Sequence, residues 1–295
     1  AMSLGLSAMG GILFLGGGST VTIAQRMFEG MNSFALLAIP LYTFAGFTMS
    51  KGGISKRLMD FCYSIVGHIY GGLAHVNVLS SMIFAGISGS AVADTAGVSG
   101  MFMPEMVRKG YSKNFTVAVT AISSTIGIII PPSIPMVVIA GICGISTGKL
   151  FLGGIIPGVL CGLAQMIVSY FLAKKEGVPK EPGHFTIGPV LHGLWESWPA
   201  LLMPIIIVGT ITMGIVSPTE AGVIAVVYGL FVGMVIYREV KLKDLFDILV
   251  DSAKTTGGIM LIVASASLFS FVCTKFGIAE AASGLLASIA HNQFV

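Results

Sequence analysis

The stretch that decides the fold is Gly71–Met106, which reads GGLAHVNVLSSMIFAGISGSAVADTAGVSGMFMPEM. Its first part, Leu73–Ile87, is mostly apolar or small for 15 residues, whereas a membrane-spanning helix needs about 20 apolar residues. The run ends in the polar cluster Ser88–Ser90 (SGS), and a second short apolar run, Ala96–Met106, follows. Two half-length helices that meet at a polar tip are typical of a re-entrant hairpin. We therefore predict such a hairpin over residues 71–109.

The next apolar stretch, Phe115–Gly141, reads FTVAVTAISSTIGIIIPPSIPMVVIAG. It predicts a helix over residues 113–147 that is broken at Gly127 and at Pro131–Pro135, because proline removes a backbone donor and disfavours helical geometry in the residue before it. Unpaired backbone is tolerated at membrane depth only where it is buried in protein or lines a cavity. The hairpin tip and the break are therefore predicted to bind a ligand together.

The composition is that of a membrane protein. Of the 295 residues 55% are hydrophobic and only 10% are charged, with a mean hydropathy of +0.93, whereas soluble domains carry about 25% charged residues. We predict an all-α polytopic membrane protein. The phosphate-binding pattern GxxxxGK[ST] is absent from the sequence, which disfavours an ATP-driven pump, and no nucleic-acid partner is expected.

Four cysteines lie far apart, mostly in apolar runs, and we interpret them as small buried hydrophobic residues rather than a disulfide or metal set: Cys62, Cys143, Cys161 and Cys273. The chain opens inside an apolar run with alanine rather than methionine. We expect it to be a fragment of a longer polypeptide.

Six stretches are predicted to span the membrane, the first as the remainder of a span: 3–15, 34–49, 150–172, 199–216, 221–237 and 257–274. Residues 51–70 and 241–254 have the pattern of amphipathic helices at the membrane surface. Residues 177–197 are predicted to form a loop with an interfacial piece, in which Trp195 marks the headgroup level together with the following Trp198.

The distribution of basic residues predicts an orientation. If the hairpin opens to the cytoplasm, 13 of the 16 lysines and arginines lie inside, as the positive-inside rule requires. Lys51–Ser55 (KGGIS) is echoed 224 residues later by Lys275–Ala279 (KFGIA), with five predicted crossings between them. An odd number of crossings makes the second copy upside down, and inverted repeats are a signature of secondary transporters that bind substrate near the midplane.

Several motifs resemble one family: GLAHVNVL at 72–79, FAGISGSAVAD at 84–94, SSTIG at 123–127, IPPSIPM at 130–136, GKLFL at 148–152, IPG at 156–158 and SPTEA at 217–221. Over nearly the whole chain the sequence is similar to the large membrane (M) subunit of tripartite ATP-independent periplasmic (TRAP) transporters. The resemblance implies sodium-driven uptake of an organic acid, such as sialic acid or a C4-dicarboxylate, across the bacterial inner membrane. It also implies a periplasmic binding protein that delivers the substrate, a small Q membrane subunit, and an elevator motion of the transport domain.

The resulting domain organisation is as follows: scaffold helices at 1–50, an amphipathic arm helix at 51–70, a transport domain at 71–147, a helix ending the first repeat at 148–176, scaffold helices of the second inverted repeat at 198–275, and the start of a second arm helix at 276–295. The second hairpin and the second sodium site are expected beyond Val295.

Sodium prefers neutral carbonyl and hydroxyl oxygens in a dry site, and the tip and the break supply them. The predicted Na⁺ ligands are Ser88, Gly89, Ser90, Ser124, Thr125, Gly127 and Pro131. The alternative for the serines is ordinary packing of small residues between helices.

The second hairpin helix begins near Ala91, and the partial positive charge at its N-terminus favours a carboxylate. The predicted substrate site is Ser90, Ala91, Asp94, Pro132 and Ser133. For Asp94 two roles are open: a functional membrane carboxylate, or a cap that binds free backbone amides of that helix. Asn77 and His75 are expected near the mouth of the hairpin, packed or hydrogen-bonded to the scaffold, and Glu220 is expected to be a structural residue at a helix start.

Two other functions were weighed. A stand-alone sodium/dicarboxylate carrier of the same superfamily carries triplets like Ser-Asn-Thr at its hairpin tips, where this chain has Ser-Gly-Ser. Gly86–Gly89 matches the GxSG motif of intramembrane serine proteases, which need a histidine base near the serine. The histidines that follow, His184, His192 and His291, are predicted outside the apolar spans, so an enzyme is not expected.

Overall fold

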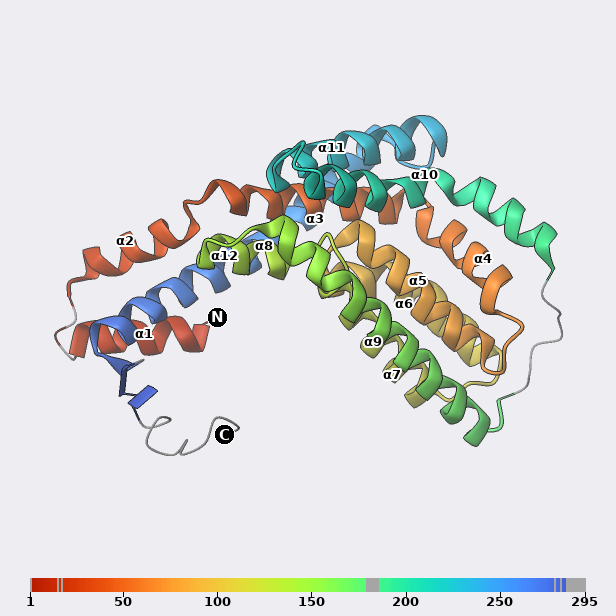
Figure 1. Ribbon diagram of the computed structural model, residues 1–295, viewed down its shortest axis with the longest axis horizontal. Coiled ribbons are helices and arrows are strands. Elements are labelled where there is room, and N and C mark those ends of the chain that lie inside the picture. The colour runs from red at the N-terminus through yellow and green to blue at the C-terminus, as the bar shows by residue number, and fades with distance from the viewer. Residues whose placement is uncertain are drawn as a thin grey trace. The chain divides into compact units, whose positions relative to one another are not determined.

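The computed structural model describes residues 2–14, 16, 18–178, 186–278, 280–281 and 283–284, and every regular element in that part of the chain is a helix. Figure 1 shows them: α1 Met2–Phe14, α2 Thr20–Met31, η1 Phe34–Leu37, α3 Ala38–Lys51, α4 Ile54–Val66, α5 Gly72–Ser88, α6 Ala91–Arg108, α7 Lys113–Ser124, η2 Thr125–Ile128, α8 Ile134–Cys143, α9 Thr147–Lys175, α10 Ile187–Thr212, α11 Pro218–Phe231, the π-helix η3 Val232–Ile236 and α12 Leu242–Lys275. The predicted all-α fold class is confirmed.

Among the described residues, five helical stretches are long and apolar enough to cross a membrane: Phe34–Lys51, Thr147–Lys175, Ile187–Thr212, Pro218–Ile236 and Leu242–Lys275. They confirm a polytopic membrane protein. Helices α5 and α8 are apolar but shorter, as the half-length runs in the sequence predict.

Two predicted boundaries are wrong. Helix α10 begins at Ile187, inside the predicted loop. Pro189 does not prevent this, because it stands in the first helical turn, where a backbone amide would have no hydrogen-bond acceptor within the helix. Helix α12 is continuous from Leu242 to Lys275, so the predicted separation between an amphipathic piece and a span is absent. No proline interrupts it, and Gly257 is accommodated in its interior. Residues 179–185 of the predicted loop, and 279, 282 and 285–295 of the predicted second arm helix, lie outside the described residues.

Serine side chains cap the starts of five of the described helices. In each case the serine side chain accepts a hydrogen bond from the backbone amide three residues later, which satisfies one of the amides that a helix start leaves unpaired. These N-cap residues are Ser90 for α6, Ser112 for α7, Ser133 for α8, Ser146 for α9 and Ser217 for α11. At α11, Glu220 completes the cap by accepting from the Ser217 amide at 2.7 Å, so its predicted structural role is confirmed.

The chain divides into two compact units, residues 1–34 with 254–295, and residues 35–253. In the first unit, α1, α2 and the C-terminal part of α12 enclose a small core of Ala8, Ile12, Ile23, Leu268 and Val272.

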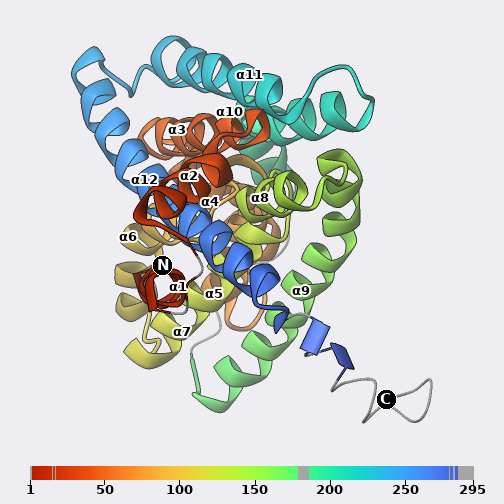
Figure 2. The same ribbon diagram turned by 90° about the vertical axis from the view of Figure 1, so that its left-hand side faces the viewer.

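In the second unit, α11 packs along α3 and beside α10 (Figures 1 and 2). The hydroxyl of Tyr42 on α3 donates to the carbonyl of Pro218 at the start of α11 at 2.9 Å.

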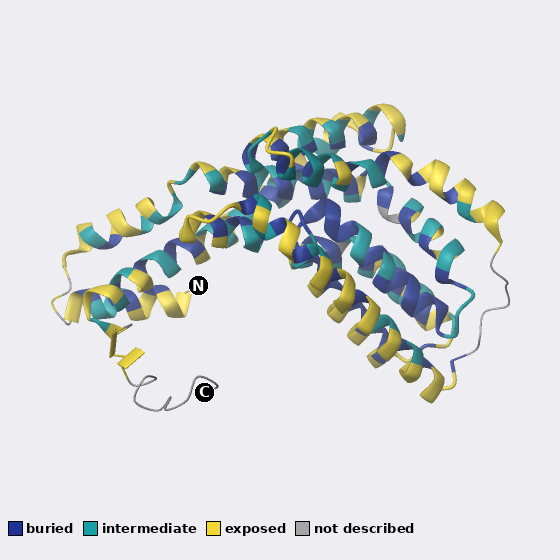
Figure 3. Ribbon diagram, in the orientation of Figure 1, coloured by how far each residue is buried: buried dark blue, intermediate teal, exposed yellow. Residues whose placement is uncertain are grey.

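Helix α5 is the centre of the second unit. It packs against α4, α6, α7 and α9, and 14 of its 17 residues are buried, so its ribbon is almost wholly dark blue in Figure 3. By contrast α9 exposes large apolar side chains such as Ile156 and Phe171, as suits a surface that faces lipid.

The prediction that all four cysteines are buried is wrong for two of them. Cys62 is buried, but Cys143 and Cys161 are exposed. An apolar run in a membrane protein therefore does not imply burial.

Candidate functional site

The tip between α5 and α6 is a buried turn of three residues. Helix α5 ends at Ser88, Gly89 adopts the left-handed conformation with φ 62°, and Ser90 returns to extended geometry to start α6. The hydroxyl of Ser88 lies 3.4 Å from both the amide and the carbonyl oxygen of Ser90. The side chain of Ser90 accepts from the amide of Ala93 at 3.4 Å. The turn therefore brings the Ser88 and Ser90 hydroxyls and the Ser90 carbonyl close together in a buried place.

The break in the following helix lies against this tip. Helix α7 ends at Ser124, and α8 begins only at Ile134. The amide of Ile134 donates to the carbonyl of Gly89 at 3.0 Å. A Cβ added at Gly89 would lie 2.5 Å from the carbonyl oxygen of Pro132, and one added at Gly127 would lie 3.3 Å from the backbone of Ser90. The two interruptions thus meet backbone to backbone.

Asp94, one turn into α6, is the most unusual side chain of the site. It is 0% exposed, and neither carboxylate oxygen has a hydrogen-bond partner among the described residues. The hydroxyls of Ser81 and Ser124 lie close enough to interact with this carboxylate, but neither makes a hydrogen bond of standard geometry to it. The interpretation of Asp94 as a helix cap is wrong, because Ser90 makes that cap. A buried carboxylate without partners is unfavourable unless a cation or a proton neutralises it.

The other predicted ligands differ in position. The hydroxyls of Ser124 and Ser133 are buried and donate to the carbonyls of Thr120 and Ile128. The Ser133 oxygen also accepts from the Met136 amide, so one of its lone pairs is used. Pro131 is buried in the break. Thr125 is exposed and donates to Ile122 at 2.6 Å, and none of the contacts described above brings it to the tip.

A row of polar contacts between α5 and α7 continues the site away from the tip. The side-chain nitrogen Nδ2 of Asn77 donates to the Thr120 hydroxyl at 2.8 Å, and its side-chain oxygen Oδ1 accepts from the Ser123 hydroxyl at 3.0 Å. The hydroxyl of Ser81 donates to Ser123 at 3.2 Å. Of the two roles expected for Asn77, packing agrees with its complete burial. A hydrogen bond to the scaffold is wrong, because its partners stand on α7. The helical spacing of Asn77 and Ser81, matched by Thr120 and Ser123, was the signal in the sequence.

Two helices of the predicted scaffold touch the tip region closely. A Cβ added at Gly46 of α3 would lie 3.1 Å from the Cα and Cβ atoms of Ser88. A Cβ added at Gly86 would lie 3.0 Å from the ring of Pro204 in α10. His75 is buried and pairs through Nε2 with the carbonyl of Tyr70 at 3.2 Å.

The protease pattern lacks support in the geometry. The Ser88 hydroxyl is engaged within its own turn. His192 lies in α10, contrary to our prediction that it is outside the spans, and its Nε2 is 3.2 Å from Glu196. His184 and His291 lie outside the described residues.

The fold defines an all-α polytopic membrane protein with a buried polar tip between two half-length helices. The model of the family described as tripartite ATP-independent periplasmic transporter, DctM component, matches residues 1–295, and the chain belongs to this family. It is therefore a multi-pass protein of the bacterial inner membrane.

Curated relatives agree. The chain is 40% identical over 272 residues to the C4-dicarboxylate TRAP transporter large permease protein DctM of Pseudomonas aeruginosa, covering 92% of this chain and 64% of that protein. It is 36% identical over 272 residues to the sialic acid TRAP transporter large permease protein SiaM of Vibrio cholerae, with the same shares. It is 38% identical over 274 residues to the isethionate TRAP transporter permease protein DctMQ of Oleidesulfovibrio alaskensis, covering 93% of this chain and 43% of that protein. The chain thus spans 43% to 64% of the length of these three relatives.

Proposed function

We propose that the complete permease containing this chain imports an organic acid, such as sialic acid, a C4-dicarboxylate or a related carboxylate, across the inner membrane. The relatives named for such acids support this class of substrate. The family's description as tripartite and periplasmic, and a relative whose name, DctMQ, joins M and Q, support a periplasmic binding protein and a small Q subunit as partners. The family match also favours this arrangement over a stand-alone carrier.

We further propose that uptake is coupled to Na⁺ held at the junction of the tip and the break. The observation that carries this is the buried junction itself, in which the Gly89 carbonyl and Ile134 amide join two helix interruptions. The donor set fits a hard cation: buried hydroxyl oxygens of Ser88 and Ser90, carbonyl oxygens around Pro131, and the unpaired carboxylate of Asp94 nearby. Bound sodium supplies positive charge in a place of low polarity.

The chain's own residues would then bind and orient the acid. The amides at the start of α6, beginning at Ala91, favour a carboxylate, and Ser90, Pro132 and Ser133 border the same junction. Ser88 and Gly89 shape the turn that presents these groups. In the elevator motion that we propose, the hairpin and the broken helix would move as one body, since their interruptions are hydrogen-bonded to each other.

The test is uptake by the complete permease in proteoliposomes, with and without an inward sodium gradient and the matching binding protein. We expect uptake only when both are present; uptake with the binding protein alone would refute sodium coupling. Ser90→Leu should abolish uptake while the protein still inserts. Ser146→Leu is the matched control, because Ser146 makes the same 3.4 Å N-cap bond at α9 but is exposed and away from the tip.

A further inference from the structure

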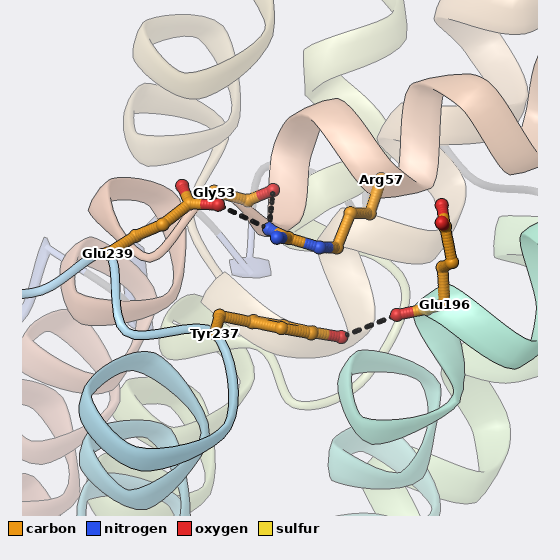
Figure 4. A network of polar contacts seen from close by, with 5 residues as sticks. All are labelled: Gly53, Arg57, Glu196, Tyr237 and Glu239. Atoms are coloured by element: carbon orange, nitrogen blue, oxygen red, sulfur yellow. Dashed lines mark hydrogen bonds and ion pairs between the residues drawn. The ribbon is translucent and has the colours of Figure 1, made fainter.

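A second polar cluster lies where α4 meets α10 and the end of η3 (Figure 4). Nη1 of Arg57 is 2.7 Å from Oε1 of Glu239 and donates to the carbonyl of Gly53 at 3.1 Å. The guanidinium lies 4.0 Å from the ring centroid of Tyr237, whose hydroxyl donates to the carbonyl of Glu196 at 2.9 Å. Arg57 therefore links the start of α4 to the segment after η3, and Tyr237 links that segment to α10.

Beside this clamp is an open cavity of about 520 Å³, lined by Lys56, Arg57, Asp60, Trp195, Glu196 and Trp198, among others. The two tryptophans are 77% and 44% exposed, which is unusual for such large apolar rings and indicates a surface that meets something other than water. The cavity is large enough for a small polar group together with the stem that carries it.

Besides Arg57, the cavity lining carries charges of both signs: the cation Lys56 and the carboxylates Asp60 and Glu196. Burial raises the pKa of Asp60 most, Lys56 and Arg57 lower it, and Glu196 raises it further. Glu196 also faces His192 at 3.2 Å. The cavity thus offers one cation for an anionic group, and two carboxylates that a further cation would stabilise.

The cavity lies at the height where a membrane span ends. Ile236 is the last residue of the candidate span Pro218–Ile236, and Tyr237 and Glu239 of the clamp follow it directly. Helix α4 is amphipathic, and tryptophans beside a span end are typical of the headgroup region. A ligand that arrives from the bilayer would meet this cavity with its polar end.

We propose that the cavity binds the headgroup of a zwitterionic phospholipid that carries a primary ammonium, with Lys56 binding the phosphate, Asp60 and Glu196 binding the ammonium, and Trp195 and Trp198 packing beside the glycerol region. An anionic headgroup without the ammonium leaves both carboxylates unpaired. A trimethylated ammonium keeps the charge but donates no hydrogen bond to them. The site is independent of the transport site and of the proposed substrate.

The test uses tryptophan fluorescence, since Trp195 and Trp198 are the only two tryptophans in this chain. The complete permease is purified in detergent, with any tryptophan outside this chain replaced by phenylalanine. It is titrated with phosphatidylethanolamine, phosphatidylcholine or phosphatidylglycerol, each brominated on the acyl chains near the glycerol. We expect half-maximal quenching by phosphatidylethanolamine at about a threefold lower mole fraction than by the other two lipids, as partly exposed ion pairs allow.

The double variant Asp60→Asn/Glu196→Gln should abolish this preference. Lys56→Gln should weaken the binding of all three lipids to the same extent. Asp247→Asn is the matched control, because its exposed carboxylate pairs only with Lys51 among the described ion pairs. Equal quenching midpoints in the unmodified protein, or a preference for phosphatidylglycerol, would overturn the proposal without any variant. A preference that survives the double variant would overturn it as well.

Discussion

The backbone amide of Ile134 donates a hydrogen bond of 3.0 Å to the backbone carbonyl of Gly89. These residues belong to separate interruptions, one in the turn between α5 and α6 and the other at the start of α8. Because the bond uses backbone atoms only, it joins the two interruptions directly, with no side chain between them.

Gly89→Ala should reduce uptake at least about tenfold, the factor that ~1.4 kcal/mol represents. The new methyl group would lie 2.5 Å from the Pro132 oxygen and push the interruptions apart. Gly144→Ala is the matched control: Gly144 has φ 65° and so suffers the same left-handed strain, but nothing lies within 4 Å of its added Cβ. Uptake in proteoliposomes, normalised to inserted protein, makes the comparison. Equal losses in the two variants would show that backbone strain alone is responsible.

Asp94→Asn should raise the melting temperature of the complete permease in sodium-free buffer. The substitution replaces a buried carboxylate that lacks hydrogen-bond partners by a neutral side chain of the same shape. The same variant should lose most of the stabilisation that sodium gives, which amounts to about 2.7 kcal/mol when the ion is at a hundred times its Kd. Thermal unfolding over a sodium series measures both effects, with Asp247→Asn as the exposed control. A normal sodium response in Asp94→Asn would remove Asp94 from the proposed ion site.

Asn77→Leu should destabilise the protein by about 1 kcal/mol, since it removes two buried hydrogen bonds to α7 and leaves the Thr120 hydroxyl without one partner. Thr125→Val should change stability by less than about 0.5 kcal/mol, because Thr125 is exposed. Unfolding of both variants in the same detergent measures the difference. If the two variants behave alike, the contacts between α5 and α7 do not hold the hairpin.

The predicted orientation places Lys174 in the cytoplasm and Lys149 in the periplasm. These residues stand near opposite ends of α9, Thr147–Lys175, so an impermeant amine reagent added outside intact cells should label position 149 and not position 174. Cysteine versions, Lys149→Cys and Lys174→Cys, allow the same test with an impermeant thiol reagent once the four native cysteines are replaced by serine. Labelling of position 174 and not of position 149 would show that the predicted orientation in the membrane is inverted.

The helices of the site could be predicted from sequence because the signals were local and strong. The apolar run before Ser88, the glycine turn and the prolines at 131, 132 and 135 each have one structural meaning. The start of α10 was not predicted because a proline such as Pro189 is compatible both with a loop and with the first turn of a helix. Only the tertiary context decides between the two. Glu220 was interpreted correctly, since its cap is formed within four residues of sequence.

Contacts between residues far apart in the sequence were harder to predict. The sequence showed that Asp94 is a membrane carboxylate, but not that Ser90 already occupies the capping position and leaves Asp94 unpaired. The partners of Asn77 stand more than 40 residues away on α7, and a single sequence does not specify which helix faces which. The cavity beside Arg57 combines three helices, so no single stretch of sequence indicates it.

The close approach of Gly46 to Ser88 bears on leakage. A single added carbon at position 46 would already lie 3.1 Å from the Cα and Cβ atoms of Ser88, so no water molecule fits between these two positions. In the ion-coupled mechanism that we propose, energy is lost wherever hydrated ions pass beside the moving part. At this contact Gly46 has no side chain that could turn aside and open a path for them.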